Sequence, residues 1–199
     1  FWLLHSIEEP VIEGNRFTVR RTKNGDTGML QNHVLLPETG NAQIEKVGGK
    51  GKEFWVFGTN YPNDALPNRP DDANERGAWR VEVSPAAPAT ENYFLNVMQV
   101  ADNTCKQMNN VKRIDAEKVV GVQIADRVVT FSKDSRPLSG KVDMTVDGNA
   151  TMKFVITDLI PGTWQIKKDG KVYIPAMEVR SDDGILSFEG TAGHYEFLR

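Results

Sequence analysis

The chain has 199 residues, of which 39% are hydrophobic and 26% are charged, an ordinary composition for a globular protein with a buried core. Its formal net charge of -3 argues against a general nucleic-acid or membrane binder, because such proteins usually carry a basic excess. A single cysteine, Cys105, excludes an internal disulfide and a cysteine-only metal site. No apolar run approaches the about 20 residues that a membrane-spanning helix needs.

The first half of the chain consists of short β-branched or aromatic runs separated by Gly, Asn, Asp and Pro, a pattern typical of all-β proteins. The first run, FWLLH, is apolar on both faces and therefore predicts a strand inside a sheet. Asn24-Gly25 predicts a tight hairpin turn, because these residues tolerate a positive φ. The strands predicted here are 1–5, 15–21, 29–36, 44–47, 53–57, 77–83 and 93–101, enough for a sandwich.

The second half repeats the pattern with shorter runs. Turns are expected at 147–149 (Asp-Gly-Asn) and at Asp169-Gly170, and closing strands are expected to start at Asp183-Gly184 and Ala192-Gly193. The other predicted strands are 119–124, 127–132, 141–146, 151–157, 163–167 and 171–174. We therefore predict an all-β fold, an antiparallel β-sandwich followed by a smaller antiparallel C-terminal β domain. The expected division is residues 1–105 for the sandwich portion, 106–116 for a polar connection and 117–199 for the C-terminal domain.

The segment 44–61, IEKVGGKGKEFWVFGTNY, combines lysines, glycines and aromatic residues. Its two predicted strands, 44–47 and 53–57, are expected to pair across a glycine-lysine turn at 48–52. Lysines suit a carboxylate or sulfate, and aromatic rings suit the face of a sugar, so the segment predicts contact with an anionic glycan. A plain hairpin with solvated lysines is the alternative. Strand alternation places Trp55 and Phe57 on one face. The residues expected to contact substrate are Lys50, Lys52, Tyr61 and Arg76.

Catalytic and metal-binding patterns are weak. The histidines, His5, His33 and His194, are far apart in sequence and show no metal-ligand spacing. His194 and Tyr195 are neighbours in a strand and should face opposite sides, which indicates that Tyr195 and Phe197 belong to the core. Carboxylate pairs fall in turns, where solvated turn chemistry explains them. Oxygen ligands within 60–72 leave a calcium site open.

Several phrases resemble the C-terminal β region of heparinase II/III-like polysaccharide lyases. They are WLLHSIEEP (2–10), LLPE (35–38), IEKVGGKGKEFWV (44–56), NYP (60–62), GAWRVEVSP (77–85) and PGTW…GILSFEGTAGHYEF (161–197). In that family an α-helical toroid precedes a large β-sandwich, and uronate-containing polysaccharides are cut by β-elimination. The reaction needs a base, a group that neutralises the uronate carboxylate and an acid for the leaving oxygen.

The resemblance implies a chain that begins partway through the sandwich and is not catalytic alone. Its partners would be acidic polysaccharide and the toroid and upstream sandwich strands of the parent lyase, with no nucleic acid and no membrane span. It implies secreted or periplasmic localisation and no cofactor, while a structural Ca or Zn ion in the parent enzyme stays open. A free-standing carbohydrate-binding module, a purely structural or oligomerisation domain, and a chain that becomes active with a separate toroid chain are the alternatives.

Overall fold

The structure is a computed structural model that describes residues 1–61, 77–134 and 136–199. The chain divides into two compact units, Phe1–Met108 and Asn109–Arg199, called unit 1 and unit 2 below. Every regular element among the described residues is a β-strand, so the predicted all-β class is confirmed. Within these residues, no helix has the length and hydropathy that a bilayer crossing requires.

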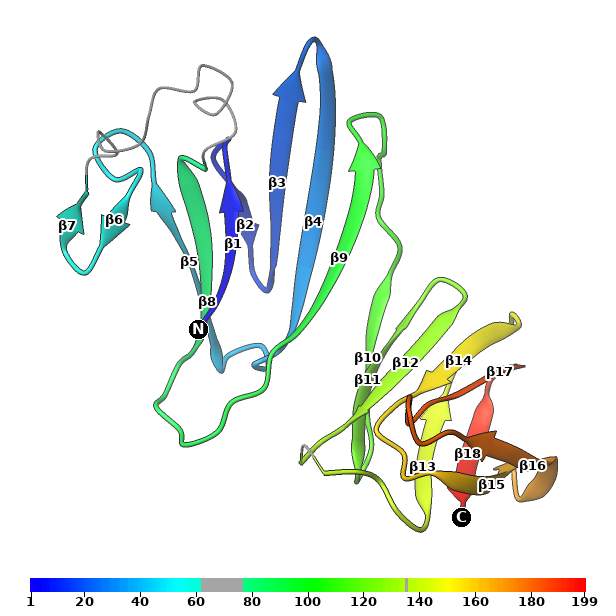
Figure 1. Cartoon of the computed structure of the whole chain (residues 1–199). Helices are drawn as coiled ribbons and strands as arrows, with labels where there is room; N and C mark the ends of the chain where they lie inside the picture. The colour runs from blue at the N-terminus through cyan, green and yellow to red at the C-terminus, as the bar shows by residue number, and fades with distance from the viewer. Residues whose placement is uncertain (62–76, 135) are drawn as a thin grey trace. The chain divides into compact units, whose positions relative to one another are not determined.

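Unit 1 is built from two sheets that enclose a small apolar core (Figure 1). The first sheet, called sheet A, has the order β1 (Trp2–Ser6), β8 (Trp79–Pro85), β5 (Ala42–Gly48). The second, called sheet B, has the order β2 (Val11–Glu13), β3 (Arg16–Lys23), β4 (Asp26–Leu36), β9 (Leu95–Asp102). Phe17 and Val34 of sheet B meet Val81 and Val83 of sheet A, and all four are buried. Alternation of apolar and polar residues along these strands produces this one-sided burial.

A short hairpin extends unit 1 beyond β5. It consists of β6 (Trp55–Val56) and β7 (Thr59–Asn60), which pair only with each other in the described part of the chain. Figure 1 shows it in cyan, beyond the end of β5 and away from sheet B.

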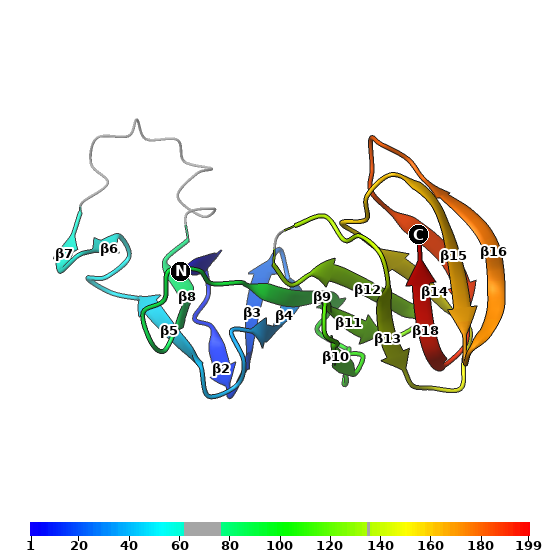
Figure 2. The same cartoon turned by 90° about the horizontal axis from the view of Figure 1, so that it is seen from below.

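Unit 2 is a second two-sheet sandwich with the larger core (Figure 2). One sheet has the order β10 (Val111–Asp115), β11 (Val119–Ile124), β12 (Arg127–Ser132), β14 (Met152–Ile156), β17 (Leu186–Gly190). The other has the order β13 (Val142–Val146), β18 (Gly193–Leu198), β15 (Gly162–Lys168), β16 (Lys171–Val179). Buried Trp164, Phe154, Tyr195 and Phe197 come from both sheets and fill the space between them.

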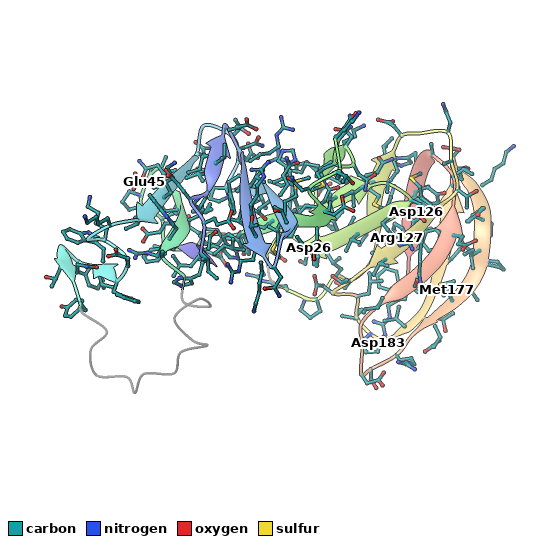
Figure 3. All side chains as sticks on the ribbon, turned by 90° about the horizontal axis from the view of Figure 1, so that it is seen from above. Asp26, Glu45, Asp126, Arg127, Met177 and Asp183 are labelled. Carbon is teal, nitrogen blue, oxygen red and sulfur yellow. The ribbon has the colours of Figure 1, made fainter. Side chains whose placement is uncertain are left out.

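Turn chemistry predicted several local features correctly. Asn24 and Gly25 have φ of 56° and 90° and join β3 to β4, while Asp169 and Gly170 have φ of 50° and 76° and join β15 to β16. The strands β11 and β12 have the predicted bounds, and the turn between them carries Asp126, which forms an ion pair with Arg127 (Figure 3).

Long-range pairing differs from the sequence-based expectation. The segment 147–149 does not close a hairpin, because β13 pairs with β18 whereas β14 pairs with β12 and β17. The β12–β14 pairing is parallel. The closing strands β17 and β18 likewise belong to different sheets. A turn motif fixes only the local chain reversal, and packing of the two apolar faces decides which strands become neighbours.

Three further expectations are wrong. The first strand lies at an edge of sheet A and not inside it, and its outward-facing Leu3 is exposed. The segment 53–57 does not pair with 44–47, because β5 pairs with β8 instead. The polar segment 106–116, expected as a connection, contains β10, an edge strand of which only Ile114 is buried. Edge strands can be mostly polar, so hydrophobic patterning detects them poorly.

Candidate functional site

The glycine-rich turn after β5 is shaped by a tryptophan. Gly48 has φ of 150°, and a Cβ there would lie 2.3 Å from the Ala78 carbonyl oxygen. Gly49 has φ of 77°, and its Cβ would lie 2.7 Å from the Trp79 ring. Only glycine fits such an approach without displacing its neighbour. The Gly-Gly pair therefore serves to pack the turn on half-buried Trp79, and it redirects the chain away from sheet A.

The segment that follows, residues 48–61, is called the lobe below. Its loop is held by backbone hydrogen bonds: the Lys52 N–H donates to the Gly49 carbonyl (2.8 Å), and the Trp55 N–H donates to the Lys52 carbonyl (3.3 Å). Phe54 is bound twice, since its N–H donates to Asn60 Oδ1 (2.8 Å) and its carbonyl accepts from the Tyr61 N–H (3.2 Å). These bonds bring Tyr61 beside Phe54, which follows Lys52 by two positions in the sequence.

The charge of the lobe comes from two lysines and one glutamate. The Lys52 Nζ lies 5.4 Å from the centroid of the Trp55 ring, a cation–π geometry. Lys50 is exposed and has no ion pair or side-chain hydrogen bond among the described residues. The backbone N–H groups of Glu53 itself and of Gly51, the latter donating at 2.9 Å, lower the pKa of the Glu53 carboxyl. The Glu53 carboxylate therefore accepts hydrogen bonds from the backbone of its own loop. Lys50 and Lys52 are both exposed to solvent.

Phe57 is the residue that sequence reasoning misplaced. It lies outside β6, in the two-residue turn before β7, with φ of 46°, followed by Gly58 with φ of 86°. Trp55 and Phe57 therefore do not share a strand face, and the expectation that they do is wrong. The Phe57 side chain is 99% exposed. The signal in the sequence was Phe-Gly between two short β-forming pairs, which is the pattern of a two-residue hairpin turn.

A fully exposed aromatic residue with positive φ is unusual in two respects. Non-glycine residues in this region other than Asn, Asp and His are rare, because the Cβ approaches the backbone. Exposed Phe also loses the stabilisation that burial supplies. Local strain of this kind is a reason to look for function at the position.

Of the four residues expected to contact substrate, the lobe carries Lys50, Lys52 and Tyr61. Tyr61 is 58% exposed. Arg76 lies outside the described residues, as does nearly all of the 60–72 segment considered for calcium. Across the ranges that the structure describes, no three His, Cys, Asp or Glu side chains gather closely enough to hold a metal ion.

The histidines occupy three different sheets, on β1, β4 and β18. His33 lies opposite Arg16, and burial together with the Arg16 charge lowers its pKa. His194 Nδ1 lies 3.2 Å from Thr145 Oγ1, while the adjacent Tyr195 points into the core of unit 2. The expected opposite orientation of His194 and Tyr195 is confirmed, and these two groups cannot act on one proton.

The carboxylate pairs that the structure describes have structural partners. Glu8 accepts a hydrogen bond from the Thr22 N–H, and Glu9 forms an ion pair with Lys46. Asp182 and Asp183 both contact Arg180. Each of these carboxylates stabilises a turn or joins two segments.

Comparison with known proteins finds a family match within unit 2. Residues 113–199 match the heparinase II C-terminal domain, a range that covers nearly all of unit 2. No protein with a curated description matches the chain. The resemblance of the C-terminal region to heparinase II/III-like proteins is therefore confirmed. The lobe lies in unit 1, outside the matched range.

Proposed function

Because residues 113–199 match the heparinase II C-terminal domain, we propose that the chain is the C-terminal β part of a polysaccharide lyase. Its substrate class is acidic, uronate-containing polysaccharide, and its reaction is β-elimination. The toroid and further sandwich strands of the parent enzyme are its partners. A lyase with such a substrate works where the polysaccharide is, so we propose a secreted or periplasmic location.

Within that enzyme, the chain supports the catalytic cleft without supplying the catalytic groups. Two features support this role. The three histidines are dispersed over three sheets, and Tyr195, a candidate base by residue type, is fully buried with a pKa raised to about 12 by burial first and then by Tyr173 and Asp169. A general base should titrate near the working pH and reach its substrate, and Tyr195 does neither.

The lobe is the surface of unit 1 that fits an anionic glycan best. Lys50 and Lys52 present cations to carboxylate or sulfate groups, while Phe57 and Tyr61 present exposed aromatic faces. Arg76 is retained as a further proposed contact. If the chain is instead a free-standing carbohydrate-binding module, the lobe is also its expected glycan-binding surface. If the chain is a purely structural domain, the lobe has no binding role.

Affinity electrophoresis tests glycan contact directly. The 199-residue chain is run in native gels containing heparin, alginate or pectin, and we expect at least one of them to retard it. Lys50→Ala/Lys52→Ala should abolish most of the retardation. Lys153→Ala/Lys171→Ala, which removes the same charge from exposed positions of unit 2, is the control. Relative to its own migration in a polymer-free gel, it should be retarded as much as the parent chain is.

The outcomes separate the proposals. Equal migration of both double variants with every polymer would remove the lobe as a contact surface and favour the structural domain. Release of unsaturated uronate by the 199-residue chain alone, followed by ultraviolet absorbance, would contradict the non-catalytic role. In the parent lyase, the Lys50/Lys52 variant should raise KM more than it lowers kcat, because it removes binding and not chemistry.

A further inference from the structure

The two sheets of unit 1 cover each other only in part. Register relates Phe17 of β3 to Asn32 of β4 and Met98 of β9, and in the same way Val19 to Leu30 and Val100. Cross-strand partners project to the same face, and Phe17 faces the core. Met98 and Val100 therefore lie on the core-facing side of sheet B, yet they are 52% and 77% exposed.

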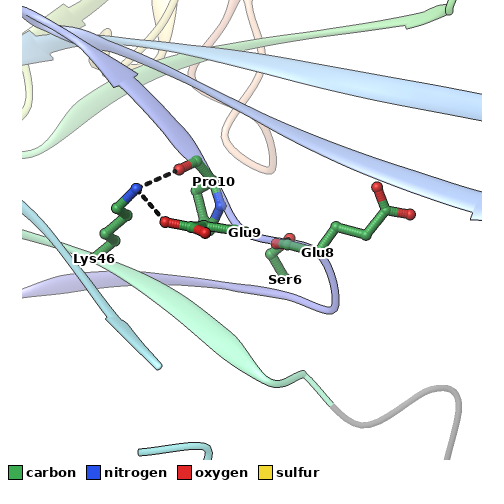
Figure 4. Close-up of polar contacts among 5 residues, drawn as sticks. All are labelled: Ser6, Glu8, Glu9, Pro10 and Lys46. Atoms are coloured by element: carbon green, nitrogen blue, oxygen red, sulfur yellow. Dashed lines mark hydrogen bonds and ion pairs between the residues drawn. The ribbon is translucent and has the colours of Figure 1, made fainter. Parts of the chain in front are cut away.

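One side of the sandwich is closed. Lys46, on β5, reaches across to the segment before β2 and binds Glu9 Oε1 at 2.6 Å and the Pro10 carbonyl at 3.2 Å (Figure 4). The β5 edge of sheet A therefore lies over the β2 edge of sheet B. Sheet A has three strands and sheet B has four. With β5 placed over β2, no strand of sheet A lies over β9, which is at the other edge of sheet B.

The open side contains a hollow of about 410 Å³. Ser6 and Ile7, at the end of β1, line it from sheet A, and Val19, Leu30 and Val100 line it from sheet B. Gly28, also in its wall, has nothing within 4 Å of the position of a Cβ. The hollow is thus the uncovered continuation of the unit 1 core beside β1.

The edge of β1 has the features of a strand that receives a neighbour. Among the described residues β1 pairs only with β8, so one row of its backbone N–H and C=O groups faces the open side. Exposed edges are usually blunted by Lys, Pro or bulges. Trp2–Ser6 contains none of these residue types, whereas β5, the other edge of sheet A, carries Glu45 and Lys46.

A buried polar atom beneath the same face lacks a partner. Asn32 is fully buried, and its Nδ2 donates to Asn96 Oδ1 at 2.8 Å. Asn32 Oδ1 accepts no hydrogen bond from the part of the chain that the structure describes. Buried acceptors are normally satisfied, so Asn32 is a local weakness of this face, while its full burial keeps it out of reach of a group that docks above.

We propose that a fourth strand pairs with the free edge of β1, continues sheet A and lays alternate apolar side chains over Leu30, Met98 and Val100. A strand is the one occupant that satisfies both the free backbone row and the apolar face. The strand belongs to the lyase polypeptide outside residues 1–199, and in this respect the inference rests on the proposed function.

Photo-crosslinking in the parent polypeptide identifies the occupant. Benzoylphenylalanine is placed at position 100, and at position 172 as a control, because Val172 is also exposed (55%) but lies on β16 of unit 2. We expect position 100 to cross-link to one segment outside residues 1–199 with alternating apolar residues, and position 172 not to reach that segment. A cross-link to residues within 1–199 or to a second copy, or no cross-link, would overturn the inference.

A stability comparison gives an independent readout. Val100→Lys should leave the Tm of the 199-residue chain unchanged, since the residue is exposed there, and lower the Tm of the parent polypeptide by about 2–4 °C. Val172→Lys should change neither, and equal behaviour of the two variants in the parent would refute the docked strand. Uronate release by the parent is scored separately. Cross-linking without lyase activity removes only the proposed function, and activity without cross-linking removes only this inference.

Discussion

Tyr195 shows how far one residue can be understood from sequence and packing together. Its place on the buried face of β18 was predicted from alternation with His194 and is confirmed. Its ring centroid lies 4.7 Å from that of Phe154, and its hydroxyl donates to the Thr191 carbonyl at 2.6 Å. Gly190 leaves room for that hydroxyl, because a Cβ there would lie 2.4 Å from Tyr195 Oη. Such partners come from other strands, and alternation cannot name them.

Tyr195→Phe should lower the free energy of unfolding by about 1 kcal/mol near neutral pH, the usual net worth of such a hydrogen bond. Burial raises the pKa of Tyr195 to about 12 from an ordinary value of 10.0. The unfolded chain therefore ionises this group first, so the wild-type stability that depends on it is complete below pH 10 and is lost as pH rises towards 12. Urea unfolding between pH 7 and 12 should show a larger loss in the wild type than in Tyr195→Phe, in which Lys141, whose pKa is raised by its hydrogen bond to Glu196, still contributes.

The matched control for this measurement is Tyr173→Phe. Tyr173 donates to the Glu189 carbonyl at 2.9 Å but is exposed, so its removal should cost less and leave the alkaline decline in place. If Tyr195→Phe declines with pH as the wild type does, the alkaline loss belongs to another group.

At the scale of elements, the β6–β7 hairpin joins local strain to a surface role. Phe57 and Gly58 both have positive φ, as the two central residues of a type I′ turn do. Asn is favoured at the first of these positions, and Phe is not. The hairpin thus has an aromatic residue at a turn position where the backbone conformation favours Asn.

Phe57→Asn should therefore raise the free energy of unfolding by about 1 kcal/mol, the scale of the left-handed penalty per residue, while weakening retardation in the glycan-containing gel. Phe57→Leu is the control, because it keeps the strain and removes only the ring; it should weaken retardation without stabilising. Thermal unfolding and affinity electrophoresis of the same samples give both readouts. Full retention of glycan binding by Phe57→Asn would show that the exposed ring is not a contact.

Elements were predictable where their cause is local. The Asn24-Gly25 and Asp169-Gly170 turns, and the strands β11 and β12, follow from residues within a few positions of one another. The lobe was misjudged because its course depends on Trp79, which lies some thirty positions later and makes Gly48 and Gly49 necessary. Lys50, Lys52 and Tyr61 lie in the lobe, and their role as contacts stays a prediction.

At the scale of the whole molecule, two sandwiches follow each other along the chain. The predicted fold class is confirmed, whereas the pairing of β12 with β14 and of β13 with β18 depends on contacts between segments far apart in sequence. Unit 2 has a continuous core that includes Trp164, Phe154 and Tyr195 and draws on both of its sheets. A core of this kind is what an independently folding domain requires.

Residues 109–199 expressed alone should therefore fold and unfold cooperatively, and the full chain should show two calorimetric transitions, one of which matches the fragment. Unit 1, with its uncovered Met98 and Val100, should give the transition at lower temperature. Differential scanning calorimetry of the chain and the fragment checks both statements. A fragment without a cooperative transition, or a single transition in the full chain, would mean that the units depend on each other for stability.

The position of β18 also sets the order in which unit 2 can be assembled. β18 lies between β13 and β15, which do not pair with each other, so the four-stranded sheet is divided until residues 193–198 insert. During synthesis β13 and the β15–β16 hairpin emerge before β18, and until it arrives their facing edges have unpaired backbone N–H and C=O groups. Closure of the sheet is thus a late event over a long sequence separation, which makes folding slow and leaves the waiting edges exposed to mispairing. The loss of β18 would therefore separate β13 from the β15–β16 hairpin.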